Sequence, residues 1–473
     1  MEIVNAKLIR LYNDTFYLYD SIKNSIVEIT KEDFINLSKI DNNGINLDRE
    51  KMTHLVNLQR NNNVCIYPNT TVIEQPLSPF VYDYLDKRVS NCILQVTRDC
   101  NLRCSYCAYS QKNYIDRNHN SEEMSQEIAK KAIDFLQRKS SDCKEIRISF
   151  YGGEPLLNYQ LIVYSVLYAK KIMPYKSIKF IITTNLTLLN KNMIEFFSKY
   201  EIKLVVSIDG PKQINDLYRR KALDGKGSFN STYRNLMKIY ERFPDYFSRC
   251  VSINAVVDPH SNISLIERFF INDKVMHNIN VEYHILDDTR LNMTLGRGES
   301  FVRNYNENQL NEMIIYAANG YKTFDKKLMF SDIDDLIDVE NVLSKNVKYI
   351  PEKIHHGGPC LPGHKKLFVS SNGTLYVCEK ANQNSKALVI GDLESGFDYD
   401  KINAIYNIGK MTKEECKRCW AFRFCQICAM TIDDGTSLSY DLKKDQCAKQ
   451  KLIAENIIKN YIVKNKFKTV LKG

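Results

Sequence analysis

The most informative segment of this chain is T-R-D-C-N-L-R-C-S-Y-C-A-Y, which runs from Thr97 to Tyr109. Its thiols have a C-x3-C-x2-C spacing and are Cys100, Cys104 and Cys107. The apolar run before it, residues 92–96, predicts a short buried strand. Three thiolates on a loop after a strand can bind three irons of a [4Fe–4S] cluster and leave one iron open, because such clusters usually have four Cys ligands. The alternatives are a zinc site, which usually includes a C-x2-C pair, or unrelated buried thiols.

This segment resembles the signature of the radical S-adenosylmethionine (radical SAM) enzymes. In that family the open iron binds the amino and carboxylate groups of S-adenosylmethionine. Tyr106, directly before the third Cys, matches the aromatic position of the signature. The resemblance therefore implies a cofactor-binding role for Tyr106 and metal-binding roles for the three thiols.

Length and composition predict a soluble protein of two or three domains. The chain has 473 residues, of which 44% are hydrophobic and 26% charged, as is ordinary for globular proteins. No apolar run approaches the about 20 residues that span a bilayer, and the N-terminus has no signal pattern, so we expect a cytoplasmic protein without membrane contact. Fourteen cysteines in such a chain favour metal ligands over disulfides.

The formal charge of +10 is concentrated near the C-terminus. Residues 449–473 contain seven Lys and one Glu. Such an excess can indicate nucleic acid binding. The preferred interpretation is the solvated face of a basic C-terminal helix, residues 451–473, and we expect no nucleic acid partner.

Residues 1–80 are predicted to form a separate small module. Strands are expected at 7–12, 15–20 and 25–28, and helices at 31–40 and 48–59. This order resembles the winged-helix leader-recognition domain of enzymes that modify ribosomally made peptides. A sheet edge of this kind can take an extended peptide as an added strand. The alternative is an N-terminal extension packed on the core.

Between residues 90 and 286, apolar strands alternate with helical patterns. Strands are expected at 92–96, 146–150, 178–183, 204–208, 250–257 and 281–285. Helices are expected at 124–138, 159–173, 191–199, 231–242 and 263–270. Six β/α units with right-handed crossovers predict an α/β fold, namely a partial (β/α)6 barrel. Its ligands should lie at the C-terminal ends of the strands.

Two motifs follow the second and third of these strands. The run Y-G-G-E-P contains Gly152, Gly153 and Glu154; glycines let a backbone approach a ligand closely, and a carboxylate suits an ammonium group. After this strand, the run resembles the radical SAM motif that contacts the methionyl amine of the cofactor. The third strand ends in T-T-N, where Asn185 is either a cofactor contact or part of a capped strand end.

The fourth strand ends in S-I-D-G-P, which begins at Ser207, and Arg219 follows twelve residues later. This run resembles the subgroup that contains the anaerobic sulfatase-maturing enzymes and peptide maturases. There, the serine and arginine of the motif contact the ribose and carboxylate of the cofactor. Ser207 and Arg219 match by residue type and spacing, and an Arg can bind a carboxylate through two hydrogen bonds. The alternative for Arg219 is a surface ion pair.

Residues 287–356 are polar and are interpreted as a bridge between domains. Over residues 357–450 the thiols are Cys360, Cys378, Cys416, Cys419, Cys425, Cys428 and Cys447. Their order resembles the SPASM domain, an Fe–S-rich C-terminal extension that holds two auxiliary [4Fe–4S] clusters. A zinc ribbon is the alternative. The family commonly has three residues between the fifth and sixth Cys, whereas this chain has two, Gln426 and Ile427.

The family pairing assigns these seven thiols to two clusters. The second auxiliary cluster would be bound by Cys416, Cys419, Cys425 and Cys447, and the first by Cys360, Cys378 and Cys428. Seven thiols cannot fill eight positions, so one iron of the first cluster lacks a Cys. Candidates to fill it are His355, His356 and His364. A substrate thiolate is preferred, because iron–sulfur clusters favour soft thiolate ligands. Buried thiols without ligand spacing are expected at Cys65, Cys92, Cys143 and Cys250.

Together, these resemblances imply a radical SAM peptide maturase with S-adenosylmethionine and three [4Fe–4S] clusters. The cofactor yields a 5′-deoxyadenosyl radical that takes a hydrogen from a carbon of a ribosomally made, Cys-rich precursor peptide. A Cys sulfur then bonds to that carbon as a thioether, and an auxiliary cluster accepts the remaining electron. The leader holds the peptide, and a flavodoxin or ferredoxin is the expected reductant.

Two other functions stay open. A sulfatase-type maturase would oxidise Cys or Ser to formylglycine. In that family an Asp beside the second Cys of the C-terminal domain acts as base, and this chain has the longer carboxylate Glu379 there. Glu379 is therefore the candidate catalytic residue. The other hypothesis is a non-catalytic Fe–S electron carrier or sensor, but such a protein would not need the cofactor motifs.

Overall fold

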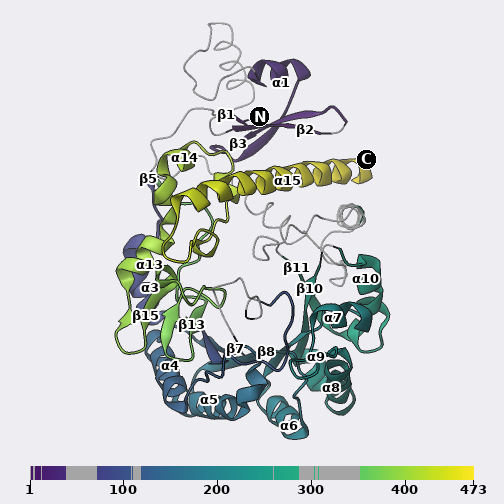
Figure 1. Ribbon diagram of the computed structural model, residues 1–473. Coiled ribbons are helices and arrows are strands. Elements are labelled where there is room, and N and C mark those ends of the chain that lie inside the picture. Colours follow the sequence, from purple (N-terminus) through teal and green to yellow (C-terminus); the bar gives the residue numbers. More distant parts are fainter. Residues whose placement is uncertain are drawn as a thin grey trace.

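The computed structural model describes residues 2–3, 6–11, 13–38, 72–107, 109, 119–258, 260–286, 303, 307, 343 and 352–472. The helix predicted at 48–59, Cys65 and most of the bridge 287–356 lie outside the described residues. Figure 1 shows the N-terminal sheet, the long C-terminal helix α15 (Tyr440–Lys472) beside it, and the larger sheet with its helices below both.

The N-terminal part forms an antiparallel sheet followed by α1 (Lys31–Ser38). Its strands are β1 (Glu2–Ile3), β2 (Ala6–Arg10), β3 (Phe16–Asp20) and β4 (Ser25–Ile29), which confirms the three strands that the sequence predicts and adds β1. Because side chains alternate across a strand, Leu8 packs in one cluster with Leu37 of α1, while Ile9 and Tyr19 pack in another with Ile458 of α15. Both faces of this sheet are therefore buried.

Six consecutive parallel strands form one side of the larger sheet, from its edge strand inwards, each where the sequence predicts one. They are β6 (Asn91–Thr97), β7 (Glu145–Gly152), β8 (Ser177–Thr184), β9 (Lys203–Ser207), β10 (Val251–Val257) and β11 (Asn280–Ile285). All neighbouring pairs among them are parallel. Their carboxyl ends therefore meet at one edge, where α/β proteins bind ligands.

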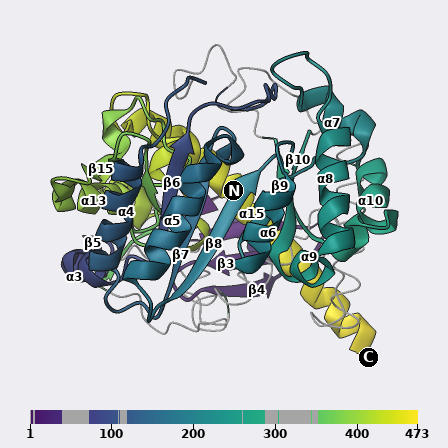
Figure 2. The same ribbon diagram turned by 90° about the horizontal axis from the view of Figure 1, so that it is seen from below.

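Helices connect these strands and cover one face of the sheet. The predicted helices are observed as α4 (Gln126–Lys139), α5 (Tyr159–Ile172), α6 (Lys191–Lys199), α8 (Phe229–Arg242) and α10 (Ile263–Asn272). The sequence analysis missed three short ones, α3 (Val81–Lys87), α7 (Lys212–Tyr218) and α9 (Pro244–Cys250). Ser125, Asn190 and Asn262 cap α4, α6 and α10 by accepting backbone N–H groups. Figure 2 shows α4, α5, α6 and α8 on the outer side.

The C-terminal part continues the same sheet. Strand β13 (Leu367–Val369) pairs parallel with β6, and β14 (Thr374–Tyr376), β15 (Val389–Asp392) and β16 (Gly396–Phe397) follow as antiparallel neighbours. The sheet therefore has ten strands.

The remaining elements are small, apart from the terminal helix. They are α13 (Tyr399–Tyr406), α14 (Lys413–Lys417) and a parallel pair of β5 (Val72–Ile73) with β12 (Lys353–Ile354). Helix α15 has 33 residues and passes through position 450 without a break. Within the described residues, no helix combines the length and apolarity that crossing a bilayer requires.

Candidate active site and iron–sulfur centres

The loop after β6 brings the first three thiols together. Burial raises the pKa of Cys100, and the nearby Glu154, Cys104 and Cys107 raise it further. The N–H of Cys107 donates to the carbonyl of Cys104 at 3.1 Å, which closes a tight turn between these two ligand candidates. Cys100, Cys104 and Cys107 thus form one group at the carboxyl end of β6.

Backbone hydrogen bonds fix this loop against the segment that carries Arg219. The N–H of Arg103 donates to the carbonyl of Arg220 at 2.7 Å, and the N–H of Ser105 donates to the carbonyl of Tyr218 at 3.2 Å. The cysteine loop and the predicted cofactor arginine are therefore neighbours, although more than a hundred residues separate them in sequence.

The two glycines after β7 allow a close approach of two backbone segments. A Cβ on Gly152 would lie 2.0 Å from the carbonyl oxygen of Thr97, and a Cβ on Gly153 would lie 2.0 Å from that of Asp99. The N–H groups of Gly153 and Glu154 donate to these carbonyls at 3.0 and 2.8 Å. The neighbour that excludes side chains here is protein backbone, whereas the sequence interpretation assigned that role to a ligand.

Glu154 is buried and connects the end of β8 to the cysteine loop. Its carboxylate accepts hydrogen bonds from the Thr184 hydroxyl at 2.6 Å and from the N–H groups of Leu156 and Asn185 at 3.0 and 2.7 Å. Burial raises the pKa of Glu154 to about 7, although these hydrogen bonds oppose the rise. The side chain of Asn185 donates to Asn101 at 2.9 Å. Two predicted cofactor residues are thus adjacent.

Arg219 is buried and paired with Asp209. Its Nε and Nη2 atoms donate to the two carboxylate oxygens of Asp209, each at 2.8 Å. The hydroxyl of Tyr106 donates to the same carboxylate at 2.5 Å, and the guanidinium lies 5.4 Å from the centroid of the Tyr106 ring. The surface ion pair considered for Arg219 is therefore wrong, because only 8% of its side chain is exposed.

Ser207 lies at the end of β9, opposite Asn254 of β10. Both are half-buried, while Val206 and Ile253 on the other face are fully buried. The Oδ1 atom of Asn254 is buried and accepts no hydrogen bond within the described residues. An unused acceptor therefore lies beside Ser207 on the face away from the helices.

Four later thiols line one cavity of about 700 Å³ and are Cys416, Cys419, Cys425 and Cys447. Burial, together with the nearby thiols Cys416, Cys419 and Cys447, raises the pKa of Cys425 to about 12. We call this space the four-thiol cavity. Its thiols are the set that the sequence analysis assigns to one auxiliary cluster.

The remaining thiols gather near Lys366. Burial, together with the neighbouring Glu379 and Cys428, raises the pKa of Cys378 to about 11. The pKa of Lys366 is raised although burial opposes this, because Glu379, Cys378 and Cys360 are nearby. The amine of Lys366 lies 2.9 Å from the Glu379 carboxylate. We call Cys360, Cys378 and Cys428 the three-thiol group.

The three candidate histidines lie in different surroundings. His356 lines the four-thiol cavity rather than the three-thiol group to which the sequence interpretation offered it. His355 accepts a hydrogen bond from the N–H of Gly409 at 2.7 Å, and His364 packs on the ring of Tyr84.

All three groups consist of thiols, which are the soft ligands that iron–sulfur clusters favour. Within the described residues, no three His, Cys, Asp or Glu side chains are arranged to ligate one ion. A zinc ion draws its sulfur ligands to within about 4 Å of one another. A [4Fe–4S] cluster binds each thiolate through a different iron and so holds the thiolates farther apart.

A model of the radical SAM superfamily matches residues 94–270. The chain carries a radical SAM domain. A cysteine-type anaerobic sulfatase-maturating enzyme of Clostridium novyi is 30% identical over 39% of this chain and 48% of its own length. The radical SAM cyclopropyl synthase TigE of Paramaledivibacter caminithermalis is 26% identical over 47% of this chain and 51% of its own length. The matches to the first curated relatives span 41%, 34% and 48% of those proteins.

The fold also resembles a solved structure. Native anSMEcpe with bound AdoMet superposes with a TM-score of 0.55 at 20% identity, over 80% of this chain and 99% of that one. At this identity the likeness shows the fold of the radical SAM domain and its surroundings.

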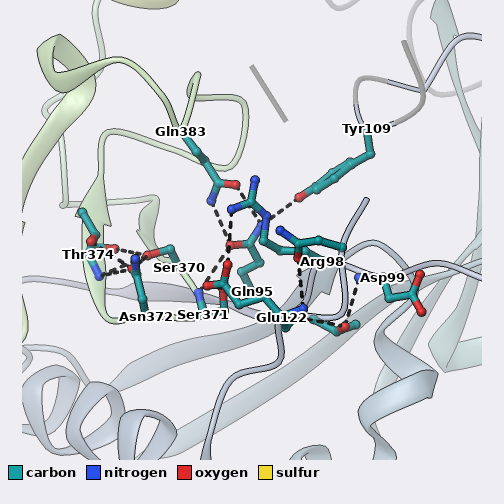
Figure 3. Close-up of polar contacts among 12 residues, drawn as sticks. Gln95, Arg98, Asp99, Tyr109, Glu122, Ser370, Ser371, Asn372, Thr374 and Gln383 are labelled. Atoms are coloured by element: carbon teal, nitrogen blue, oxygen red, sulfur yellow. Dashed lines mark hydrogen bonds and ion pairs between the residues drawn. The ribbon is translucent and has the colours of Figure 1, made fainter. Parts of the chain in front are cut away.

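A polar network joins the radical SAM domain to the C-terminal part (Figure 3). Gln95 of β6 donates to the amide oxygen of Gln383 at 3.1 Å, and Gln383 donates back at 2.8 Å. Gln95 also donates to the hydroxyl of Tyr109 at 2.9 Å, and its own oxygen accepts from the N–H of Ser371 at 3.3 Å. Gln95 therefore links the radical SAM domain directly to two segments of the C-terminal part, at Ser371 and Gln383.

The sequence analysis missed three of the residues that organise this region. Asp209 lies inside the S-I-D-G-P motif, so the sequence could have predicted it as a partner for Arg219. Gln95 and Gln383 meet across 288 positions, and no local pattern predicts that contact.

Proposed function

We propose that this protein is a radical SAM peptide maturase that forms Cys thioether cross-links in a ribosomally made precursor peptide. The observation that carries the proposal is the gathering of ten thiols into three groups. S-adenosylmethionine on the first cluster would supply a 5′-deoxyadenosyl radical that removes hydrogen from an unactivated carbon.

The first group and its neighbours fit this cofactor. Cys100, Cys104 and Cys107 would hold the cluster, and the buried carboxylate of Glu154 suits an amine. Ser207 and Asn254 offer polar groups on one face of the sheet for ribose hydroxyls. The pair with Asp209 uses Nε and Nη2 of Arg219, which leaves Nη1 for the carboxylate of the cofactor.

The other two groups support oxidation of the peptide. Converting a C–H and an S–H into a C–S bond removes one hydrogen atom, one proton and one electron from the substrate. Iron held by the C-terminal thiols is an acceptor for the electron. Glu379 lies beside Cys378 and is the candidate base for the proton. The three-thiol group leaves one iron position for the substrate thiolate, which is a soft ligand.

The N-terminal sheet supports a peptide substrate. Strand β4 is at its edge, and no strand within the described residues pairs with its outer side. An extended leader could bind there through main-chain hydrogen bonds. We therefore interpret residues 1–80 as the leader-recognition module of a cytoplasmic enzyme reduced by a flavodoxin or ferredoxin.

Formylglycine formation is the second candidate, and the sulfatase-maturating relatives favour it. Glu379 stands where that family has its Asp base, and its ion pair with Lys366 keeps a carboxylate beside Cys378. Both candidates use the same radical chemistry, so the peptide product distinguishes them.

The test is to incubate the anaerobically reconstituted full chain with S-adenosylmethionine, a reductant and Cys-containing peptides encoded beside its gene. Thioether formation removes two hydrogens per link and protects that Cys from alkylation. Formylglycine formation replaces the Cys sulfur by oxygen and creates an aldehyde that hydrazides capture. An aldehyde product would overturn the thioether proposal, and no peptide change despite cofactor cleavage would overturn both.

The control for this test is Cys107→Ala, which should give neither product with the same peptide. A Ser variant of the acceptor Cys in the peptide should still bind but should form no link. A product formed with Cys107→Ala would show that the observed chemistry does not arise from the first thiol group.

A further inference from the structure

The four-thiol cavity contains a buried lysine that the proposed reaction does not use. Lys443 is fully buried, and its amine donates to the carbonyl of Ile408 and to the hydroxyl of Thr412, each at 2.7 Å. Both acceptors are neutral oxygens. The cavity as a whole is lined by five basic side chains and by two acidic ones, Glu415 and Glu455. Its surroundings are therefore net positive.

The hydroxyl of Thr412 lies between the amine of Lys443 and a thiol. Its oxygen lies 3.3 Å from the sulfur of Cys416. Because this oxygen accepts a hydrogen bond from the Lys443 amine, the hydroxyl hydrogen of Thr412 is free to point at sulfur. A thiolate bound to iron has no proton and can only accept. The Lys443–Thr412 pair therefore presents an oriented donor to Cys416.

His356 presents a second donor to the same cavity. It is 1% exposed, and neither ring nitrogen has a hydrogen-bond partner within the described residues. A neutral imidazole always carries one N–H, and a buried donor without an acceptor is unfavourable. The adjacent His355 differs, because its Nε2 accepts from Gly409 and its Nδ1 lies 3.0 Å from the carbonyl of His356.

We propose that His356 and the Lys443–Thr412 pair form an outer hydrogen-bonding shell for the iron–sulfur cluster of the four-thiol cavity and raise its reduction potential. This inference rests on the proposed function, because it takes the cavity to hold a cluster. Reduction adds negative charge, which donors to sulfur and a nearby cation stabilise.

The positive charge beside the three-thiol group is offset by a neighbouring carboxylate. Lys366, which lies beside this group, is ion-paired with Glu379, whose carboxylate offsets the positive charge. The cluster of the four-thiol cavity should therefore have the higher potential of the two. It is the site at which the electron removed from the peptide comes to rest before it leaves the protein.

The test is a redox titration of the reconstituted full chain, followed by electron paramagnetic resonance. The signal that Cys425→Ala removes is assigned to the cavity. Thr412→Val and His356→Phe should each lower its midpoint potential. Thr412→Ser and His356→Gln keep a donor and should restore most of the loss. Lys443→Met should lower the same potential, whereas Lys366→Met should shift the other C-terminal signal only.

The outcomes separate this inference from the proposed function. Unchanged iron content and potential in Thr412→Val and His356→Phe would overturn the outer shell and leave the clusters assigned. If Cys425→Ala loses no iron, the cluster assignment itself fails. Loss of iron in His356→Phe would make His356 a ligand and would overturn its role as a donor. If Lys443→Met does not fold, the midpoint potentials of Thr412→Val and Thr412→Ser still show whether a donor at this position raises the potential of the cluster.

Discussion

The guanidinium of Arg219 is bound to the carboxylate of Asp209 by two hydrogen bonds of 2.8 Å, and both side chains are buried. The pair lies beside the first thiol group. The charge of Arg219 is close enough to Cys104 to lower the pKa of its thiol, against the larger effect of burial. A carboxylate of the protein therefore positions the arginine that the sequence assigns to the cofactor.

Replacing Asp209 should be costly. Asp209→Asn leaves the buried Arg219 charge uncompensated, which typically lowers the free energy of unfolding by about 3–5 kcal/mol. Urea unfolding measures this loss, and the affinity for S-adenosylmethionine should fall in parallel. The matched control is Glu201→Gln, whose pair with Arg249 is 60% and 62% exposed, so its loss should change the free energy of unfolding little. Equal losses in the two variants would contradict the structural role of Asp209.

A methyl group at Gly153 should displace the cysteine loop. In Gly153→Ala the new Cβ would clash with the carbonyl of Asp99 at 2.0 Å, so we expect about four fewer irons per chain after reconstitution. Gly225→Ala is the control: its φ is +67° and the space around it is open, so it should cost about 1–2 kcal/mol without loss of iron. Iron analysis of both variants distinguishes a clash from backbone strain.

Glu154 should make stability depend on pH. Burial raises its pKa from the ordinary 4.5 to about 7. Below pH 4.5 Glu154 is protonated in both the folded and the unfolded chain, so the contribution of Glu154 to stability is fully present. As the pH rises to about 7 the unfolded chain releases the proton first, and up to about 3 kcal/mol of stability is lost.

Glu154→Gln should remove this slope from the free energy of unfolding of the cofactor-free protein between pH 4.5 and 7. The control Glu145→Gln should keep the slope, because hydrogen bonding to Lys179 lowers the pKa of that exposed carboxyl. A wild-type slope in Glu154→Gln would show that another group titrates.

Loss of any one thiol of the first group should abolish cofactor cleavage. Cys100→Ala, Cys104→Ala and Cys107→Ala should each lose about four irons per chain while the C-terminal clusters persist. Cys92→Ala is the matched control, since Cys92 is a fully buried thiol outside the three groups and should keep both iron and cleavage. Undiminished 5′-deoxyadenosine production in the first three variants would refute the assignment.

Cys425 and Cys428 are close in sequence but should serve different clusters. Cys425→Ala combined with Cys447→Ala should lose no more iron than either alone, about four atoms per chain. Cys425→Ala combined with Cys428→Ala should lose about twice as much. Equal losses in the two double variants would mean that the short C-x2-C spacing has merged the groups.

Much of this architecture depends on local patterns, and that part could be predicted. Strand β7 alternates fully buried residues such as Ile146, Ile148 and Phe150 with more exposed ones, and α6 has a clear cap at Asn190. The grouping of the C-terminal thiols was implied by the resemblance to the SPASM domain, because their order along the chain resembles that of its cysteines. Cys447 follows on α15, one long helix that returns it to the same cavity.

The rest depends on contacts between distant segments. Strand β13 has three residues, which are too few to show the alternating pattern of a strand. It joins the sheet through its parallel pairing with β6, in which Leu367 is the partner of Cys92. The second buried face of the N-terminal sheet exists only because α15 packs on Ile9 and Tyr19. That contact also means that deleting residues 1–80 would expose α15, so substitutions along β4 test leader binding more cleanly than truncation.

The pairing of β13 with β6 has a consequence for biosynthesis. Strand β6 leaves the ribosome long before the residues of β13 are translated, so one of its edges stays unpaired during most of synthesis. Exposed strand edges are sites of pairing with other chains. Pairing of β13 with β6 therefore covers this strand edge and protects the nascent chain from aggregation, in addition to bringing the C-terminal thiols to the sheet.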